Sequence, residues 1–219
     1  MLEEHLNDLK EQLLAEADLV EKMLLNSIKG LFQKKHEMLE EIIRQDEPIV
    51  NSMDISIEKR CTQLIALYQP EARNLRLLLM LLKVNYDLER IADHAVNIAQ
   101  SALDILEYDI EPVKKLLEQT ANEAISMFKD SLAAFIESRD DLASKVFYRD
   151  DQVDRLRDEC INQFSLLIMQ RPESSVLFAH LLRIVRGLER IADLSTNIAE
   201  YAIFVIKGAI VKHGRDESL

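Results

Sequence analysis

An internal repeat limits the possible folds of this chain more than any other feature. Residues 88–99 read LERIADHAVNIA and residues 188–199 read LERIADLSTNIA, so nine of the twelve positions are identical. The offset of 100 residues is longer than the unit of a solenoid protein. The repeat therefore predicts duplication of a whole small domain rather than a stacked array of short units.

The similarity between the two halves extends upstream of this motif. Each copy follows a proline, Pro70 or Pro172, by about five helical turns. Further upstream, residues match at i, i+4 and i+8 of a helix, with Met23, Ser27 and Leu31 corresponding to Met127, Ser131 and Phe135. Each half is therefore predicted to hold three helices.

The predicted helices cover residues 3–34, 36–69 and 71–107, followed by 112–138, 140–170 and 173–212. Four glycines and four prolines in 219 residues are too few for a turn-rich β architecture. Because long helices joined by short turns pack antiparallel, we expect an all-α fold of two tandem, duplicated three-helix bundles, 1–109 and 110–219. Pro48 has no counterpart in the second copy, and it either kinks the second helix or shortens its start.

Composition and charge exclude several classes of protein. The net charge of −12 opposes binding to nucleic-acid phosphates and to anionic lipid headgroups. The segment MLEEHLNDLK is unlike a signal peptide, and no stretch reaches the length of about 18 apolar residues needed to span a membrane. Cys61 and Cys160 lack the spacing of a zinc site, and we expect them to be reduced core residues. The protein is expected to stay in the cytosol.

Acidic residues line one face of each repeated helix. Glu89, Asp93 and Asn97 stand at i, i+4 and i+8, and Glu189, Asp193 and Asn197 do the same. On the second helix of each half, Glu47 and Asn51 correspond to Asp150 and Asp154, again at i, i+4. Carboxylates that share a helix face repel one another. Two such faces that converge would suit magnesium, calcium, manganese or iron, which accept oxygen ligands.

Other readings of the acidic faces stay open. Arg90, Arg190 and Arg186 are able to neutralise the carboxylates in ordinary salt bridges. Retention of the acidic trio in both halves, while His94 and Leu194 differ, favours a functional site. A metal-free helical adaptor that binds partners through a groove is the second hypothesis.

An enzyme is not expected. Di-iron bundles use Glu-x-x-His pairs, and none of the five histidines has a glutamate three residues before it. The four glycines do not form a phosphate-binding loop. No catalytic residue is therefore predicted.

The duplicated bundles, the E/DxxxD motif on paired helices and the ERIxDxxxNIA signature resemble the PhoU family over nearly the whole chain. The resemblance implies metal binding by Glu89 with Asp93, Glu189 with Asp193, and Asp150 with Asp154. The pair Glu47 and Asn51 departs from the motif. Because an amide oxygen is a weaker, neutral ligand, this site is expected to bind metal less tightly or to use Asp46 or Asp54 instead.

The resemblance also implies a function. PhoU proteins are peripheral cytosolic proteins that contact the phosphate ABC transporter and a sensor histidine kinase, and they damp phosphate-starvation signalling when phosphate is plentiful. Membrane association is expected only through these protein partners. The bound metal is expected to be iron, zinc, manganese or magnesium. An accessory role for another phosphate or metal transporter stays open.

A homodimer or larger assembly is expected from the apolar residues of the last predicted helix. Ile203, Val205, Ile206 and Ile210 form an apolar row that two adjacent three-helix bundles would leave incompletely covered. The resemblance to the PhoU family implies the same, because members of that family form dimers.

Overall fold

The computed structural model describes residues 2–170, 172–208, 211–212 and 215–216. Six long helices dominate this part of the chain: α1 (Leu2–Gln33), α3 (Glu47–Tyr68), α4 (Ala72–Asp104), α5 (Glu111–Glu137), α6 (Asp140–Gln170) and α7 (Ser175–Lys207). Between and after them lie α2 (His36–Glu41), the π-helical turn η1 (Ile42–Asp46), the 3-10 turn η2 (Pro172–Ser174) and the strands β1 (Val211–Lys212) and β2 (Arg215–Asp216), which pair antiparallel. The predicted all-α fold is confirmed.

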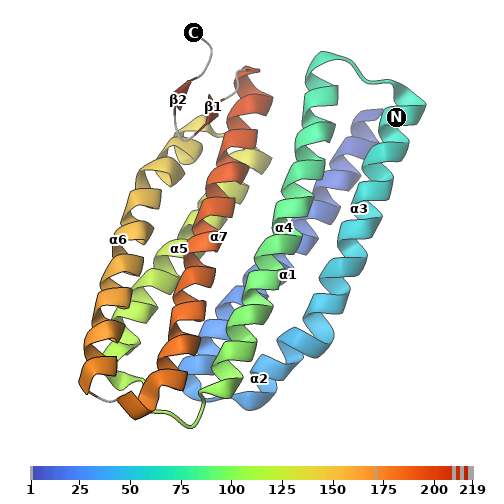
Figure 1. The fold of residues 1–219 in the computed structure, drawn as a ribbon. Coiled ribbons are helices and arrows are strands. Elements are labelled where there is room, and N and C mark those ends of the chain that lie inside the picture. Colours follow the sequence, from blue (N-terminus) through green and yellow to red (C-terminus); the bar gives the residue numbers. More distant parts are fainter. Residues whose placement is uncertain (1, 171, 209–210, 213–214, 217–219) are drawn as a thin grey trace.

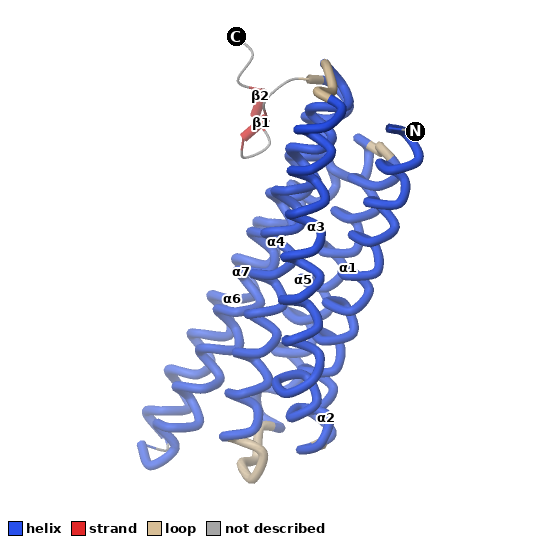
Figure 2. Tube along the Cα trace, turned by 90° about the vertical axis from the view of Figure 1, so that its right-hand side faces the viewer, coloured by secondary structure: helices blue, strands red, loops and turns tan. Residues whose placement is uncertain are grey.

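The long helices lie side by side along one axis (Figures 1 and 2). Helices α1, α3 and α4 pack together, as do α5, α6 and α7, and the two sets meet mainly where α4 lies against α7. The buried apolar side chains form one continuous core across both sets, from Leu6 to Val205. The division into units 1–109 and 110–219 stays a prediction, because nothing in this continuous core separates two independently folding parts.

Residues in the left-handed backbone conformation end several helices. Gln69 follows α3 with φ 42°, Ser138 follows α5 with φ 56°, and Gly208 follows α7 with φ 72°. The Gly208 N–H donates to the Phe204 carbonyl at 2.9 Å, which closes the last turn of α7. The predicted extension of this helix to residue 212 is therefore wrong, because the chain leaves the helix at Gly208 and then pairs as β1 and β2.

The π-helical turn explains how the chain accommodates Pro48. Pro48 occupies the second position of α3, directly after η1. The Glu47 N–H donates to the carbonyl of Ile42, five residues earlier, instead of four as in an α-helix. This wider turn separates the proline ring from the carbonyl of Arg44, with which it would clash in a regular helix. The helical path therefore continues from His36 to Tyr68 through a π-turn.

The π-turn coincides with one extra residue in the first half. In the first half, Ile42 and Val50 are fully buried. In the second half, Val146 is fully buried and Val153 is only 1% exposed. Eight positions separate the first pair (50 − 42) and seven the second (153 − 146). A single additional residue is a common origin of a π-turn inside a helix. The corresponding stretch of α6 is an uninterrupted α-helix.

Two expectations about apolar residues have different outcomes. Cys61 and Cys160 are buried free thiols, as predicted. The apolar row expected to be uncovered is mostly covered within the chain, since Ile203 and Val205 are only 6% and 5% exposed. Ile206 is partly buried, and Ile210 lies outside the described residues. This row therefore gives no support to the expected homodimer.

None of the described helices combines the length and the low charge that crossing a bilayer requires.

Candidate functional site

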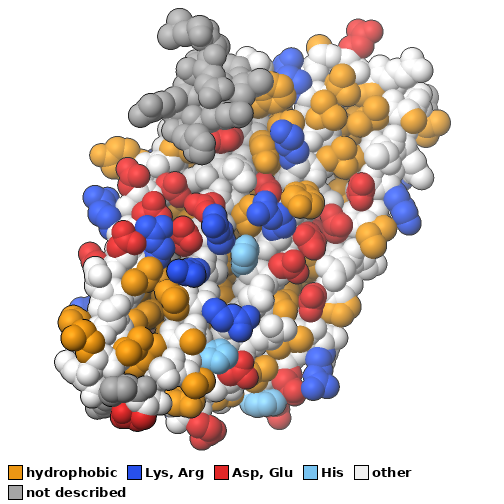
Figure 3. All heavy atoms as spheres, in the orientation of Figure 1, with side chains coloured by type: hydrophobic (Ala, Val, Ile, Leu, Met, Phe, Trp, Pro, Cys, Tyr) orange, Lys and Arg blue, Asp and Glu red, His pale blue; other side chains and the backbone are white. Residues whose placement is uncertain are grey.

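Two acidic faces lie on the same side of the molecule. Figure 3 shows acidic side chains gathered over α3 and α4 and again over α6 and α7, with basic side chains between the two groups. We call Glu47, Asn51, Asp54, Glu89 and Asp93 the first acidic face. The second acidic face consists of Asp150, Asp154, Glu189 and Asp193. Each face therefore draws its residues from two neighbouring helices of one half.

The repeated motif places its carboxylates by simple helical geometry. On α4, Ile91, Ala92 and Ala95 are buried in the core. Glu89 and Asp93 lie on the other side of the helix, where Glu89 is partly buried and Asp93 is exposed. The apolar stripe therefore fixes the rotation of the helix and turns the carboxylates toward α3.

The carboxylates of the first acidic face repel one another across α3 and α4. Burial and then the charge of Asp93 raise the pKa of Glu47 above its usual value. Burial, Asp93 and Asp54 raise the pKa of Glu89. Among the described residues, no lysine, arginine or histidine forms an ion pair with Glu47, Asp54, Glu89 or Asp93. This face is therefore a concentration of negative charge without a paired cation.

The second acidic face is built differently because an arginine enters it. Burial and then the charges of Asp193 and Asp154 raise the pKa of Asp150 to about 6. Arg157 Nη1 donates to Asp154 Oδ1 at 2.6 Å and to Glu189 Oε1 at 2.9 Å. The four predicted carboxylates therefore do come together, but a guanidinium group neutralises part of their charge.

Arg157 was not predicted as part of the second face, although its counterpart Asp54 was named as a candidate for the first. The buried residues Val50 and Val153 set a register of 103 residues between α3 and α6. In this register Glu47 and Asn51 match Asp150 and Asp154, as predicted, and Asp54 matches Arg157. Extending that register by one more helical turn would have revealed the difference in charge.

The arginines that were expected to neutralise the acidic motifs have mixed roles. Arg190 does pair with Asp193, with Nη1 and Oδ2 3.0 Å apart. Arg90 lies 3.5 Å from the buried Asp87 and forms no ion pair with the motif carboxylates. Within the described part of the chain Arg186 forms no ion pair. The salt-bridge interpretation thus accounts for part of the second face and not for the first.

The two substitutes proposed for Asn51 lie in different places. Asp46 is 4% exposed and pairs with Lys22 of α1 at 3.1 Å, so it faces away from the acidic face. Asp54 faces α4, where it accepts a hydrogen bond from Asn85 and raises the pKa of Glu89. Asn51 is exposed on the same face of α3. Of the two aspartates, Asp54 is the one placed to complete a site.

Oxygen ligands surround both faces, but the arrangement is open. Over the residues that the structure describes, no three Asp, Glu, His or Cys side chains stand close enough to hold a metal ion together. His94 is partly buried beside Asp93, and burial and then the charge of Arg90 lower its pKa. Binding of a metal would therefore require the carboxylates to turn inward, which the flexible Glu and Asp side chains on facing helices permit.

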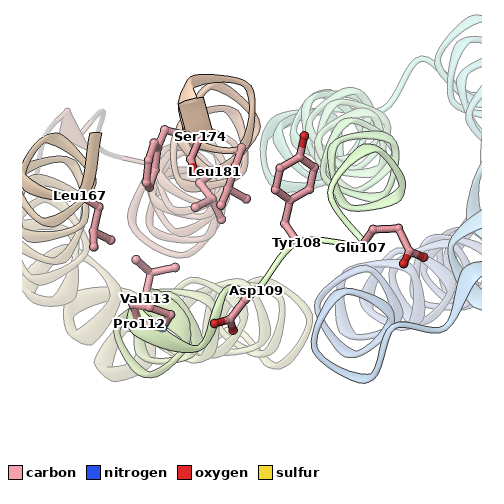
Figure 4. A pocket seen from close by; sticks show the side chains of 10 residues that line it. Glu107, Tyr108, Asp109, Pro112, Val113, Leu167, Ser174 and Leu181 are labelled. Atoms are coloured by element: carbon pink, nitrogen blue, oxygen red, sulfur yellow. The ribbon is translucent and has the colours of Figure 1, made fainter. Parts of the chain in front are cut away.

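A pocket with a mixed polar and apolar lining lies at the loop between α4 and α5 (Figure 4). Its volume is about 280 Å³, and its lining includes Tyr108, Val113, Leu167, Phe178 and Leu181. Acidic residues of the lining, Glu107 and Asp109, come from the same loop. None of the residues predicted to bind metal lines this pocket.

Comparison with known proteins finds the same duplication. The model of the PhoU domain matches this chain twice, at residues 13–102 and 117–202. A phosphate-specific transport system accessory protein PhoU homolog of Aquifex aeolicus is 36% identical over 210 residues, covering 95% of this chain and 94% of the relative. The protein of that name from Escherichia coli is 31% identical over 215 residues, covering 97% and 88%.

Solved structures show the same fold. The crystal structure of PhoU from Pseudomonas aeruginosa superposes with a TM-score of 0.91 at 29% identity, covering 95% of this chain and 100% of that one. The phosphate transport system regulatory protein PhoU from Streptococcus pneumoniae gives a TM-score of 0.89 at 28% identity, covering 97% and 100%.

Proposed function

This chain belongs to the PhoU family, and we propose that it is an accessory protein that regulates phosphate uptake. The observation that carries the proposal is the pair of PhoU domain matches, at residues 13–102 and 117–202, each of which contains one copy of the acidic motif. Relatives over nearly the whole chain are named accessory proteins of the phosphate-specific transport system. These names describe accessory proteins rather than enzymes, and we assign no catalytic residue.

The proposed partners are the phosphate ABC transporter and a sensor histidine kinase. In this proposal the protein acts in the cytoplasm and lowers phosphate-starvation signalling when phosphate is plentiful. The net charge of −12 disfavours direct contact with anionic lipids, so the protein would reach the membrane through its protein partners. The contact with the transporter is supported by the names of the relatives, which are accessory proteins of the phosphate-specific transport system. The contact with a kinase is supported only by the general resemblance to the PhoU family.

Metal binding at the acidic faces is part of the proposal. The residues that would hold the ions are Glu47, Asn51, Glu89 and Asp93 in the first half and Asp150, Asp154, Glu189 and Asp193 in the second. Iron, zinc, manganese or magnesium bound there would neutralise the repulsion between facing carboxylates and join the two helices. Burial and mutual repulsion, which raise the pKa of Glu47 and Glu89, suit the first face to this role, and within the described residues no basic side chain forms an ion pair with its carboxylates.

The second face fits a metal less well because Arg157 already occupies it. The sequence left two possibilities for the first half, weaker binding because Asn51 replaces a carboxylate, or use of Asp46 or Asp54 in its place. The position of Asp54 supports the second possibility, since Asp54 adds a negative charge at the place where Arg157 adds a positive one. An arginine within a carboxylate cluster competes with a metal ion for the same oxygens.

A metal-free adaptor is the second candidate function. The ion pairs of Arg157 and Arg190 favour it, because three of the four carboxylates of the second acidic face already have a cationic partner. Such a protein would still regulate through contact with partners, and its acidic faces would serve as binding surfaces for basic segments.

Deletion of the gene tests the proposed function. In cells with an intact transporter and ample phosphate, a reporter of phosphate-starvation genes should rise on deletion and return to its low level with the wild-type gene. Unchanged reporter expression would contradict the regulatory role. Complementation with a variant carrying Asp93→Asn and Asp193→Asn separates the two candidates, because the metal-free adaptor should retain full activity.

A homodimer remains part of the proposal on the grounds of family resemblance. Light scattering on the purified chain at tens of micromolar should give twice the mass of 25.3 kDa or more. A strictly monomeric mass would remove this element of the proposal without affecting the regulatory role.

A further inference from the structure

A row of basic side chains follows the line along which α4 and α7 pack. We call this row the basic seam, and its members, all exposed or partly buried, are Arg76, Lys83 and Arg90 on α4 and Arg183, Arg186 and Arg190 on α7. Lys83 and Arg90 correspond to Arg183 and Arg190 across the 100-residue repeat. Figure 3 shows basic side chains in this position, between the two acidic faces. A chain of net charge −12 therefore has a local concentration of positive charge.

Contacts between α4 and α7 place the first half of the seam. A Cβ atom at Gly208, which follows the last residue of α7, would lie 3.6 Å from Arg76 Cζ near the start of α4. Two turns further along α4, Lys83 Nζ lies 5.1 Å from the ring centre of Tyr201. The start of α4 therefore lies beside the end of α7, and its basic side chains face that helix.

The other end of the seam shows that α4 and α7 are antiparallel. Asp104 Oδ2, in the last residue of α4, lies 3.5 Å from His180 Nδ1 near the start of α7. Arg183 is three residues further along α7. At a rise of about 1.5 Å per residue, the seam from Arg76 to Arg183 is about 37 Å long. Antiparallel packing thus joins the short basic row of each half into one long row.

The two rows meet at His94, which is partly buried on α4. Burial lowers the pKa of His94, and the charges of Arg90 and Arg190 lower it further, against an opposing effect of Asp93. An arginine from each helix therefore acts on the same point, and the positive charge continues across the middle of the seam.

Most cations of the seam have no anionic partner within the described part of the chain. Arg90 lies 3.5 Å from the buried Asp87, and Arg190 lies 3.0 Å from Asp193. The remaining four form no ion pair among the described residues: Arg76, Lys83, Arg183 and Arg186. A row of unpaired cations favours an anionic partner from outside the chain.

The acidic faces limit the width of that partner. They border the basic side chains on both sides (Figure 3). A broad anionic surface, such as a bilayer or a nucleic-acid duplex, would bring its phosphates against these carboxylates as well as against the cations. A narrow, linear polyanion avoids this repulsion. The ligand that fits the seam is therefore long and thin.

The spacing of the cations favours an α-helix as this ligand. Arg183, Arg186 and Arg190 are three and four residues apart, and Lys83 and Arg90 are seven apart. Their attachment points therefore recur at intervals of about 5 and 10 Å, or one and two helical turns. Carboxylates at i, i+4 and i+7 of a partner helix have the same spacing. A free phosphate ion, in contrast, is held best by several cations that converge on one point.

We propose that the basic seam binds an acidic α-helical segment of a protein partner, laid along α4 and α7 with its carboxylates toward the seam. The inference rests on the proposed function, because it names the chemistry of a contact through which an accessory protein acts. Five of the six cations are arginines, whose planar guanidinium group pairs with carboxylates through two hydrogen bonds. The partner segment carries Asp or Glu one and two turns apart over at most about 24 residues.

Binding of a labelled peptide to the full-length protein tests the proposal. The probe is an alanine-rich helical peptide of about 24 residues with glutamates at i, i+4 and i+7, measured by fluorescence anisotropy. About 0.1 M salt screens the more distant acidic groups and preserves contacts shorter than about 10 Å. A second peptide has the same glutamates and two central prolines, which break the helix. We expect the helical peptide to bind at least about threefold more tightly, because its carboxylates are already aligned.

A double variant locates the binding surface. Arg183→Gln with Arg186→Gln removes two exposed cations that form no ion pair among the described residues, so the fold should persist. Affinity for the helical peptide should fall about threefold to tenfold. Lys59→Gln with Lys115→Gln is the matched control, because these exposed lysines lie on α3 and α5 and their loss changes the net charge equally. The control should keep wild-type affinity.

Several outcomes would overturn the proposal. Equal affinity for the two peptides, or an equal loss in the two double variants, would show that charge alone attracts the peptide. Tighter binding of tripolyphosphate or of phosphatidylserine vesicles at the seam would assign it to a phosphate-bearing ligand. Self-association in light scattering that Arg183→Gln with Arg186→Gln abolishes would assign it to a second copy of the chain.

The peptide assay and the reporter assay fail independently. Loss of the peptide result leaves the regulation of phosphate uptake in place, because other surfaces remain for the partners. Unchanged reporter expression on deletion removes the regulatory role and leaves the seam as a binding surface for an acidic helix.

Discussion

Arg157 Nη1 lies 2.9 Å from Glu189 Oε1, and this ion pair joins α6 to α7 in the middle of the second acidic face. Both side chains are largely buried, with exposed fractions of 22% and 19%. The same nitrogen also contacts Asp154. At the matching place in the first half stands Asp54, so the two faces carry opposite charges at this one position.

Substitution of Arg157 should expose this difference. Arg157→Gln removes the partly buried ion pairs with Asp154 and Glu189 and an exposed one with Asp158. The free energy of unfolding of the metal-free protein should fall by about 1 kcal/mol, as measured by urea denaturation with chelator present. With Mn²⁺ the second half should gain affinity, since the competing guanidinium is gone. Asp54→Asn is the matched control, and it should not destabilise the metal-free protein; equal losses in the two variants would contradict this account.

Neutralising one carboxylate of each motif should affect the two halves differently. Without metal, Asp93→Asn should be neutral or stabilise by a few tenths of a kcal/mol, because it relieves repulsion with Glu47 and Glu89. Asp193→Asn should stabilise less or not at all, because the loss of the exposed pair with Arg190 offsets part of the relief from burial and from repulsion by Glu189, which raise the pKa of Asp193. Thermal melts with chelator measure both effects.

Added metal distinguishes the metal site from an ion-pair network. A ligand at about 100 times its dissociation constant stabilises a protein by about 2.7 kcal/mol, and most of this gain should be lost in the variant carrying both Asp93→Asn and Asp193→Asn. Melts with iron, manganese, zinc or magnesium provide the test. If wild type shows no response to any metal and both single variants are destabilised, the metal sites at the acidic faces do not exist.

Asp150 should make stability depend on pH. Its pKa is raised from a usual 3.8 to about 6, first by burial and then by Asp193. Because the raised pKa belongs to the folded state, the stabilising effect of the proton is fully present below pH 3.8 and is lost as the pH rises through 6. Asp150→Asn should therefore be more stable than wild type at pH 8 by about 1 kcal/mol, after allowance for solvent screening, and equal to it at low pH.

Urea denaturation in chelator across this pH range measures the effect of Asp150→Asn. Glu118→Gln, an exposed carboxyl on α5, controls for the loss of one negative charge. A difference between Asp150→Asn and wild type that does not vary with pH would show that Asp150 does not titrate in this window.

Two glycines test the packing of the helices. A Cβ atom at Gly30 would lie 2.6 Å from Leu39 Cδ2 and 2.7 Å from its Cγ, both in the closed core beside the π-turn. Gly30→Ala should destabilise by about 1–2 kcal/mol, because overpacking exceeds the gain in helix propensity. At Gly187 the closest atom is Ile98 Cγ1 at 3.2 Å, a smaller overlap. Gly187→Ala should change stability by less than about 1 kcal/mol. Equal effects in thermal melts would contradict the packing at one of these sites.

Local sequence patterns were sufficient to predict the architecture. The apolar stripes and the repeat of LERIAD place helices, their buried faces and the acidic trio, because side chains at i and i+4 share a face in any helix. The low content of glycine and proline indicated the all-α class. The predicted helix ends were wrong where the backbone conformation of a single residue ends the helix. Gly208 is an example, because its left-handed conformation ends α7 at Lys207, five residues before the predicted end at 212.

The partners of the acidic residues depended on the tertiary structure. Arg157 and Glu189 are 32 residues apart in sequence, and only the packing of α6 on α7 brings them together. In the sequence Glu16 is one more polar residue of an amphipathic helix, yet it is completely buried in the packed bundle. Burial and ion pairing are properties of neighbouring helices rather than of one helix. Hence the repeat predicts two similar acidic faces, and only the packing shows that an arginine neutralises part of one of them.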